Sequence, residues 1–188
     1  STPIKSSAAS DVYKRQGMTG AEAARRLLNA QGIYDVTVQQ IAGELTDHYD
    51  PRTKTVNLSQ SVYGATSVAA IGVAAHECGH AMQDNEGYAP LRFRSALVPV
   101  ANFGSSLSWP LILLGLVFGG LGSPLVEIGI LMFSLAVLFQ LVTLPVEYNA
   151  SARAVRLLDA QGILAGEEVN GTRKVLNAAA LTYVAALL

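Results

Sequence analysis

Two long uncharged stretches dominate the hydrophobic pattern of the chain. Leu97–Leu121 runs for 25 residues without a charge, and Ile128–Val146 runs for 19. Since a helix needs roughly 20 apolar residues to cross the hydrocarbon core of a bilayer, the second stretch is long enough to span it. Ser and Pro residues interrupt the first stretch, whose continuous apolar part begins near Trp109. The turn signal Gly122–Pro124 separates the two, and we predict a transmembrane hairpin over residues 95–146.

The segment before these stretches begins without a pattern and then predicts a helix. Residues 1–17 have little apolar content and no period, so we expect a disordered arm or a non-native remnant there. Thr19 and Glu22 then form a T-x-x-E capping box, which opens a helix over the sequence AEAARRLLNA. Gly32 is placed to end that helix, because glycine readily adopts the left-handed conformation found at helix ends.

Alternating residues after Gly32 predict a small sheet. Val36 and Val38 alternate with polar neighbours, as in a half-buried strand. The sequences LTDHY and TKTVNLS flank the turn signal Asp50–Arg52 and are typical of a β-hairpin. We expect the strand near Thr55–Ser59 to lie at an edge of the sheet, where it would bind an extended peptide by strand addition.

A further helix signal, SVAAIGVAAHECGHAMQ with Thr66 or Ser67 as its N-cap, contains the motif HECGH at His76–His80. The i, i+4 spacing places both imidazoles on one helix face, as two ligands of a tetrahedral zinc ion require. Glu77 is rotated by about 100°, near enough to take a proton from a metal-activated water without binding the metal. With three His and eight Glu in 188 residues, chance would supply only about 0.002 such motifs.

The helix around this motif is apolar on almost all sides, which indicates that it is buried. Burying two His and a Glu within five residues costs free energy unless these side chains have partners. A metal ion would be such a partner, and a hydrogen-bonded polar cluster without metal is the alternative. Cys78 points away from the ligand face, so we expect a packing residue rather than a ligand. We expect Gly79 to let another backbone approach, although an ordinary helix glycine is the alternative.

The residues leave the third metal ligand open among His48, Asp84, Glu86, Glu127 and Glu147. Glu127 lies at the far end of the predicted hairpin, and Asp84 and Glu86 follow the motif too closely to fold back easily. His48 lies in the predicted β-hairpin and stays an alternative. Glu147 lies where the second apolar stretch ends. A carboxylate at this position is explained by metal binding, or alternatively by an ion pair or by solvation.

Composition restricts the class of protein. Charged residues make up 14% of the chain, against roughly 25% in an average soluble domain, and hydrophobic residues make up 51%. Two buried helices of a soluble protein, the alternative to the membrane hairpin, would need a larger soluble shell than the remaining residues supply. Thirteen Lys and Arg against fourteen Asp and Glu give a net charge of −1, so we expect no nucleic-acid partner. The single cysteine excludes an intrachain disulfide.

The arginines around the hairpin predict its orientation. Arg92 and Arg94 precede it and Arg153 and Arg156 follow it, while the turn between its helices has neither Lys nor Arg. By the positive-inside rule, both ends of the hairpin and the HECGH motif face the cytoplasm. The last apolar stretch, Val175–Leu188, has 14 residues and is shorter than a membrane span, and we interpret it as the start of a truncated helix.

Several segments together resemble the YugP-type membrane zinc metallopeptidases of bacteria. They are HECGH with the apolar helix before it, TDHYDPRTKTVNLS, EGYAPLRFRSALVPVAN and LFQLVTLPVEYNASARA. The resemblance runs from about Gly17 to Leu188. It implies a zincin-like core in which His76 and His80 bind zinc, Glu77 is the catalytic acid and base, and Glu147 is the third ligand.

The resemblance also bears on the residues after Glu147. Similar membrane zinc proteases often carry Asp four residues after the ligand Glu, whereas this chain has Ser151, which implies a weaker second-shell contact or one made otherwise. Tyr148, Asn149 or His48 would assist the oxyanion, and the sequence does not choose among them.

We therefore predict an α+β, mostly α fold: a zincin-like catalytic core with a small β-hairpin or sheet, fused to a transmembrane helical hairpin. Residues 18–94 and 147–170 would form the core, 95–146 the hairpin and 171–188 the truncated apolar helix.

The predicted function is zinc-dependent endopeptidase activity in the bacterial cell membrane. The protein would be multi-pass, with its active site on the cytoplasmic side, and would cleave peptide or membrane-protein substrates at the lipid bilayer. A catalytically silent zinc-binding scaffold or regulator in the membrane is the alternative, although an intact Glu77 argues against it. A metal-free interaction module that packs helices through Gly115 and Gly119 is a second alternative.

Overall fold

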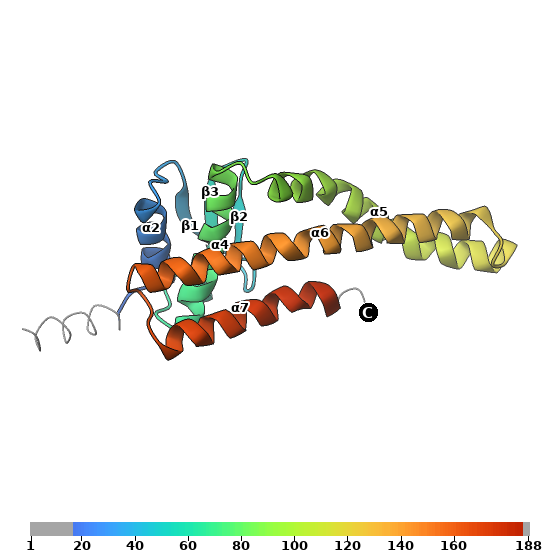
Figure 1. The fold of residues 1–188 in the computed structure, drawn as a ribbon. Helices are drawn as coiled ribbons and strands as arrows, with labels where there is room; N and C mark the ends of the chain where they lie inside the picture. The colour runs from blue at the N-terminus through green and yellow to red at the C-terminus, as the bar shows by residue number, and fades with distance from the viewer. Residues whose placement is uncertain (1–16, 186–188) are drawn as a thin grey trace, which may run out of the picture. The chain divides into compact units, whose positions relative to one another are not determined.

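The computed structural model describes residues 17–185 and shows a mostly helical chain with one small sheet (Figure 1). The predicted arm at 1–17 lies outside the described residues except for Gly17. The described residues form two compact units. One comprises 17–87 and 148–179, and the other comprises 88–147 and 180–185.

Helix α2 (Gly20–Ala30) opens the first unit with the predicted capping box. The Thr19 amide donates to Glu22 Oε2 at 2.8 Å, and the Glu22 amide donates to Thr19 Oγ1 at 3.2 Å. These two bonds satisfy backbone N–H groups that have no partner within the helix. The helix ends as predicted just before Gly32, whose φ is +69°.

The sheet contains β1 (Thr37–Ile41), β2 (His48–Asp50) and β3 (Thr55–Ser59) in the order β1-β3-β2. β2 and β3 are antiparallel, which confirms the predicted hairpin, whereas β1 pairs with β3 in parallel. The prediction that β3 lies at an edge was wrong, because β1 covers its other side. A hairpin pattern reveals only the pairing between neighbouring strands, while the parallel partner arrives from an earlier part of the chain.

Helix α3 (Gln60–Tyr63) leads into α4 (Val68–Asn85), which carries the HECGH motif. Ser67 caps α4 by accepting a hydrogen bond from the Ala70 amide at 3.2 Å, as one of the two sequence candidates predicted. α4 packs against α2 and contacts β2 and β3, and most of its residues are buried. The apolar surround of the motif therefore reflects a helix enclosed by its neighbours.

The first unit is completed by residues 148–160 of α6 (Pro124–Ala160) and by residues 167–179 of α7 (Glu167–Ala185). Ala150, Ala154 and Leu158 of α6 are fully buried and share one helix face. Val169, Thr172 and Leu176 form the buried face of α7. Small residues on α4 and α6 bring the helix axes close, which matters for the site described below.

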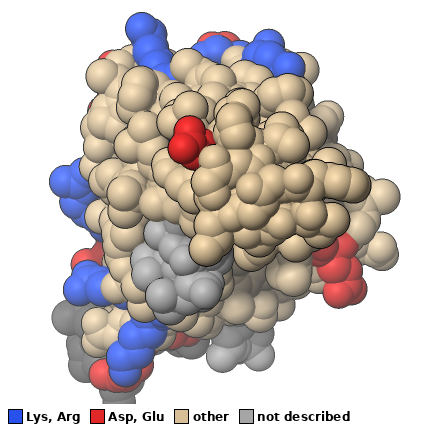
Figure 2. Space-filling model, turned by 90° about the vertical axis from the view of Figure 1, so that its right-hand side faces the viewer, with Lys and Arg blue, Asp and Glu red and all other residues tan. Residues whose placement is uncertain are grey.

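The second unit contains α5 (Ala89–Gly119) and α6 up to Glu147, joined by a short turn after Gly119. Both α5 and α6 are long and apolar enough to cross a membrane. Many of their large apolar side chains are exposed, and Figure 2 shows a broad surface without Lys or Arg. Such surfaces suit a lipid environment better than water.

The Ser and Pro residues that interrupt the apolar stretch do not interrupt helix α5. The helix is unbroken from Ala89 and contains Pro99 and Pro110. Inside it, Ser105 and Ser106 donate to the Asn102 carbonyl.

Glycines allow close contact between α5 and α6. A Cβ at Gly104 would lie 2.8 Å from the Met132 carbonyl oxygen, and one at Gly115 would lie 2.8 Å from the Val126 amide nitrogen. Gly119 faces the Ser123 side chain instead. In this structure the small residue Gly115 therefore serves packing within the hairpin.

Candidate metal centre

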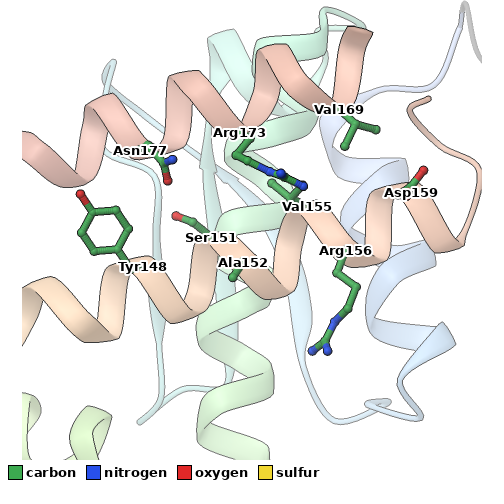
Figure 3. A pocket seen from close by; sticks show the side chains of 9 residues that line it. All are labelled: Tyr148, Ser151, Ala152, Val155, Arg156, Asp159, Val169, Arg173 and Asn177. Carbon is green, nitrogen blue, oxygen red and sulfur yellow. The ribbon is translucent and has the colours of Figure 1, made fainter. Parts of the chain in front are cut away.

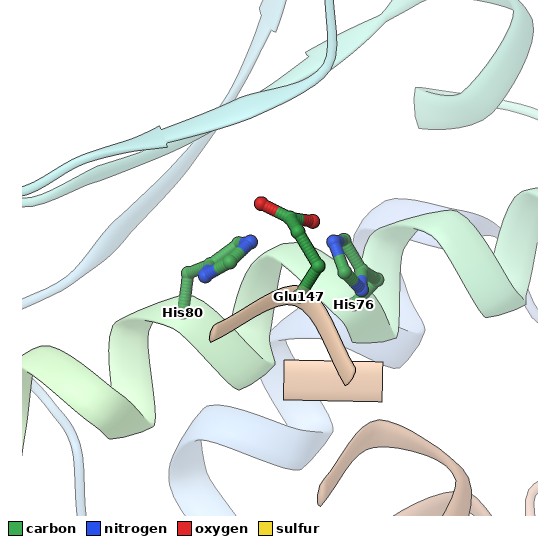
Figure 4. A group of neighbouring side chains, drawn as sticks. All are labelled: His76, His80 and Glu147. Carbon is green, nitrogen blue, oxygen red and sulfur yellow. The ribbon is translucent and has the colours of Figure 1, made fainter. Parts of the chain in front are cut away.

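Three of the residues singled out in the sequence lie together. His76, His80 and Glu147 each offer a ligand atom, and these atoms all lie within 4.8 Å of one another (Figure 4). His80 and Glu147 are buried and His76 is half-buried. Glu147 is joined directly to Tyr148 within α6, so the helix that completes the first unit also determines where this carboxylate lies.

The close approach of α4 and α6 explains why these side chains meet. A Cβ at Gly79 would lie 2.5 Å from the Ala150 carbonyl oxygen, so only glycine fits there. This contact confirms the expectation that Gly79 admits another backbone. On α6, Glu147 and Ser151 are four residues apart and share a face, just as the two His do on α4. The His76/His80 pair on α4 and the Glu147/Ser151 pair on α6 thus flank the Gly79–Ala150 contact.

Each imidazole has a hydrogen-bond partner at Nδ1. His76 Nδ1 lies 3.1 Å from Ser151 Oγ, and His80 Nδ1 lies 3.0 Å from Gln83 Oε1. A histidine that binds a metal through one ring nitrogen commonly makes a hydrogen bond through the second ring nitrogen, and this bond fixes the ring orientation. Ser151 is the residue at which similar proteases often have Asp, and its hydroxyl makes the contact here.

The donor set fits a zinc ion. Two imidazoles and one carboxylate, with a fourth position left for water or substrate, are typical of catalytic zinc. Ligand atoms around a tetrahedral zinc lie about 3.4 Å apart, since each bond is about 2.1 Å. Pairs of ligand atoms near the 4.8 Å limit would have to approach each other by about 1.4 Å on zinc binding.

Glu77 and Cys78, two of the three residues between the candidate ligand histidines, have different surroundings. Glu77 is only 7% exposed and lies on α4 outside the three-residue cluster. Cys78 is fully buried, and its Sγ contacts the Ala24 carbonyl oxygen at 3.6 Å. Burial raises the pKa of the Cys78 thiol, so it stays protonated at neutral pH. Cys78 is therefore a packing residue, as predicted.

The other candidates for a third ligand do not join the cluster. The exposed His48 contacts the Thr46 carbonyl oxygen through Nδ1 at 2.7 Å and the Asn57 side-chain amide through Nε2 at 3.2 Å. Glu127 lies in the first turn of α6. The remaining two candidates, Asp84 and Glu86, form ion pairs.

Both of these ion pairs lie near the end of α4. Asp84 accepts hydrogen bonds from Tyr49 Oη at 2.9 Å and Lys54 Nζ at 2.7 Å. The Arg153 guanidinium lies 2.7 Å from Glu86 and holds the pKa of that carboxyl below its usual value. The pKa of the Tyr49 hydroxyl is raised by burial and by its bond to Asp84. These carboxylates therefore stabilise contacts between elements and do not bind the metal.

Two residues near the site escaped the sequence analysis. Arg94 Nη2 lies 3.4 Å from Glu147 Oε1, although Arg94 entered the sequence argument only through its charge. Gln83 is fully buried and contacts His80. Its position three residues after a ligand His, on the same helix face, was the signal that would have identified it.

A cavity of about 560 Å³ lies between α6 and α7, beside the site (Figure 3). Its lining includes Tyr148, Ser151, Arg156, Asp159 and Arg173. Ser151 lines this cavity and also contacts His76. Two of the residues that the sequence suggested for the second shell or the oxyanion thus line this cavity.

The donor set of His76, His80 and Glu147 is of the kind that zinc hydrolases use for catalytic zinc. Residues 4–188 match the model of a family described as "Putative neutral zinc metallopeptidase". Over 179 residues the chain is 51% identical to the "Putative membrane protease YugP" of Bacillus subtilis (strain 168), covering 95% of this chain and 79% of the relative. The chain belongs to this zinc metallopeptidase family. No solved structure matches it, so the zincin-like classification of the core stays a prediction.

Proposed function

We propose that this protein is a zinc-dependent endopeptidase of the bacterial cell membrane. The observation that carries this proposal is the buried cluster of His76, His80 and Glu147, with the carboxylate of Glu77 on the same helix. The family and the membrane protease to which the chain is similar support the same activity.

In this proposal His76, His80 and Glu147 hold the zinc. A bound zinc ion would acidify a water molecule and polarise the substrate carbonyl. Glu77 accepts the proton of the attacking water and then returns it to the nitrogen of the leaving amine. Ser151 keeps the His76 ring in place through its contact at Nδ1.

An extended substrate would pair with an edge of the sheet. Because β3 is the central strand, we assign substrate binding to the edge strand β2, which contacts α4. Among the described residues, the side of β2 away from β3 pairs with no strand. A peptide there would form main-chain hydrogen bonds, with specificity from alternate side chains.

The location in the proposal follows from the two apolar helices and the flanking arginines. α5 and α6 would cross the bilayer, and the positive-inside rule places the metal centre on the cytoplasmic side. The substrates would be peptides or membrane proteins that reach the cytoplasmic surface of the bilayer.

The proposal is tested on the purified chain in lipid nanodiscs. Mass spectrometry should find about one zinc ion per chain, and an unfolded membrane-associated protein should be cleaved in a reaction that a chelator stops and added zinc restores. Zinc without cleavage would overturn the endopeptidase and favour a silent zinc-binding scaffold. Absence of both would overturn the metal centre as well.

A further inference from the structure

A chain of hydrogen bonds runs from His80 to a surface ion pair. His80 Nδ1 lies 3.0 Å from Gln83 Oε1, and Gln83 Nε2 donates to Asn149 Oδ1 at 2.9 Å. Arg153 Nε donates to the same Asn149 oxygen at 2.8 Å, and Arg153 Nη1 donates to Glu86 Oε1 at 2.7 Å. We call these five residues the α4–α6 relay, because His80 and Gln83 lie on α4, Glu86 is the C-cap of α4, and the other two lie on α6.

The donors and acceptors along the relay can be arranged in only one consistent order. The orientation of a side-chain amide is not visible from its heavy-atom shape, but an arginine can only donate hydrogen bonds. The atom of Asn149 that faces Arg153 must therefore be the oxygen. Gln83 must then present its NH₂ group to that oxygen, which turns Oε1 toward His80. His80 consequently carries a proton on Nδ1, so Nε2 is the ring nitrogen that would bind a metal.

His76 has a different partner at Nδ1 from His80. Its Nδ1 contacts the Ser151 hydroxyl, which can either donate or accept a hydrogen bond. The Nδ1 partners of the two histidines therefore differ. For His80 the relay through Arg153 determines the position of the Nδ1 proton, whereas the Nδ1 partner of His76 is a rotatable hydroxyl. Gln83 is fully buried, so water does not compete with its two bonds.

We propose that Gln83 and Arg153 are positioning residues that fix His80 in the tautomer required of a metal ligand. The α4–α6 relay also joins α4 to α6 at two places, Gln83–Asn149 and Glu86–Arg153, close to where α6 carries Glu147. It thus aligns the ligand face of α4 with the helix that supplies the third ligand. This inference rests on the proposed metal centre and adds the residues that orient it.

The first measurement uses the protein without metal. Nitrogen-15 NMR of histidine-labelled protein in lipid, with His80 assigned by comparison with His80→Ala, reports which ring nitrogen carries the proton. We expect Nδ1–H for wild type and Arg153→Lys, and a mixture of tautomers for Arg153→Met. Arg156→Met is the matched control on the same helix and should match wild type. An unchanged tautomer in Arg153→Met would overturn the proposal.

The second measurement is zinc affinity, determined by competition with a chromophoric chelator. Loss of an outer-shell partner typically weakens metal binding 10–100-fold, so we expect about a tenfold loss in Arg153→Met and Gln83→Leu, with recovery in Arg153→Lys. Wild-type affinity in both variants would overturn the proposal. If Gln83→Leu fails to fold, the comparison of Arg153→Met with Arg153→Lys still tests the proposal. Wild type that binds zinc without cleaving peptides would contradict the proposed function and leave the α4–α6 relay standing.

Discussion

Gly79 faces the carbonyl oxygen of Ala150 so closely that a Cβ on Gly79 would lie 2.5 Å from it. This contact brings the helix with the two ligand histidines against the helix that carries Glu147. A side chain of any kind at position 79 would separate the backbones, because the obstacle is a carbonyl group rather than a flexible side chain.

We therefore expect Gly79→Ala to destabilise the protein by about 1–3 kcal/mol and to weaken zinc binding, since overpacking forces the helices apart. Thermal unfolding and chelator competition measure the two effects. Gly171→Ala is the control, because nothing lies within 4 Å of a Cβ at that helical position. It should be neutral or stabilise the protein by up to about 1 kcal/mol. Equal behaviour of the two variants would contradict the importance of this contact.

Glu77→Gln should retain zinc and lose peptidase activity by about 10²–10⁴-fold, the usual contribution of a general acid and base. Both histidines and Glu147 stay in place in this variant, so its metal content should match that of wild type. Metal analysis and initial rates on the same preparation provide the measurement. Turnover at the wild-type rate would remove Glu77 from the mechanism.

Glu147→Ala should weaken zinc affinity strongly and abolish activity, because it removes one of three protein ligands. His48→Ala should keep metal binding nearly intact, since both ring nitrogens of this exposed residue make contacts away from the cluster. Zinc titration of the two variants distinguishes them. The opposite result, with zinc lost only in the His48 variant, would mean that the ligand set is wrong.

The orientation of the hairpin is tested with a membrane-impermeant thiol reagent on intact cells in a Cys78→Ala background. A cysteine at Gly122, an exposed position in the turn, should be labelled, whereas one at the exposed Gln31 should not. The reverse pattern would place the metal centre outside the cell. Labelling at both positions would mean that the hairpin does not span the membrane.

Glu22 gives the capping box of α2 a dependence on pH. Its hydrogen bond from the Thr19 amide lowers the pKa of the carboxyl below its ordinary value. The stabilisation is therefore complete above the unfolded pKa of about 4.3 and disappears as the pH falls through the lowered folded pKa. Glu22→Ala should melt below wild type at pH 7, and the difference should shrink under acid conditions. A difference that grows toward low pH would contradict this assignment.

The sequence was sufficient for features encoded by residues close together in the chain. The capping box at Thr19, the β-hairpin and the helix with HECGH each depend on residues a few positions apart, and all three are present. Glu147 was harder, because spacing alone left five candidates, and the family resemblance selected among them. The local pattern thus predicts two of the three candidate ligands, and the resemblance supplies the third.

The features that escaped prediction depend on contacts between distant segments. The His76–Ser151 contact joins residues 75 positions apart, and the Gln83–Asn149 bond joins residues 66 apart. The central position of β3 likewise depends on a parallel partner from an earlier segment. No periodicity or capping signal encodes such pairings, since they follow from how complete elements pack.

The burial of Cys78 has a consequence for oxidative stress. A thiol between two metal-binding histidines would ordinarily be exposed to peroxide, because the thiolate is the form that oxidants attack. Here the sulfur is enclosed against α2 and remains protonated. The proposed peptidase would thus keep a cysteine in the helix that carries its metal ligands without acquiring a redox switch. Its activity should withstand peroxide concentrations that inactivate enzymes with exposed thiolates.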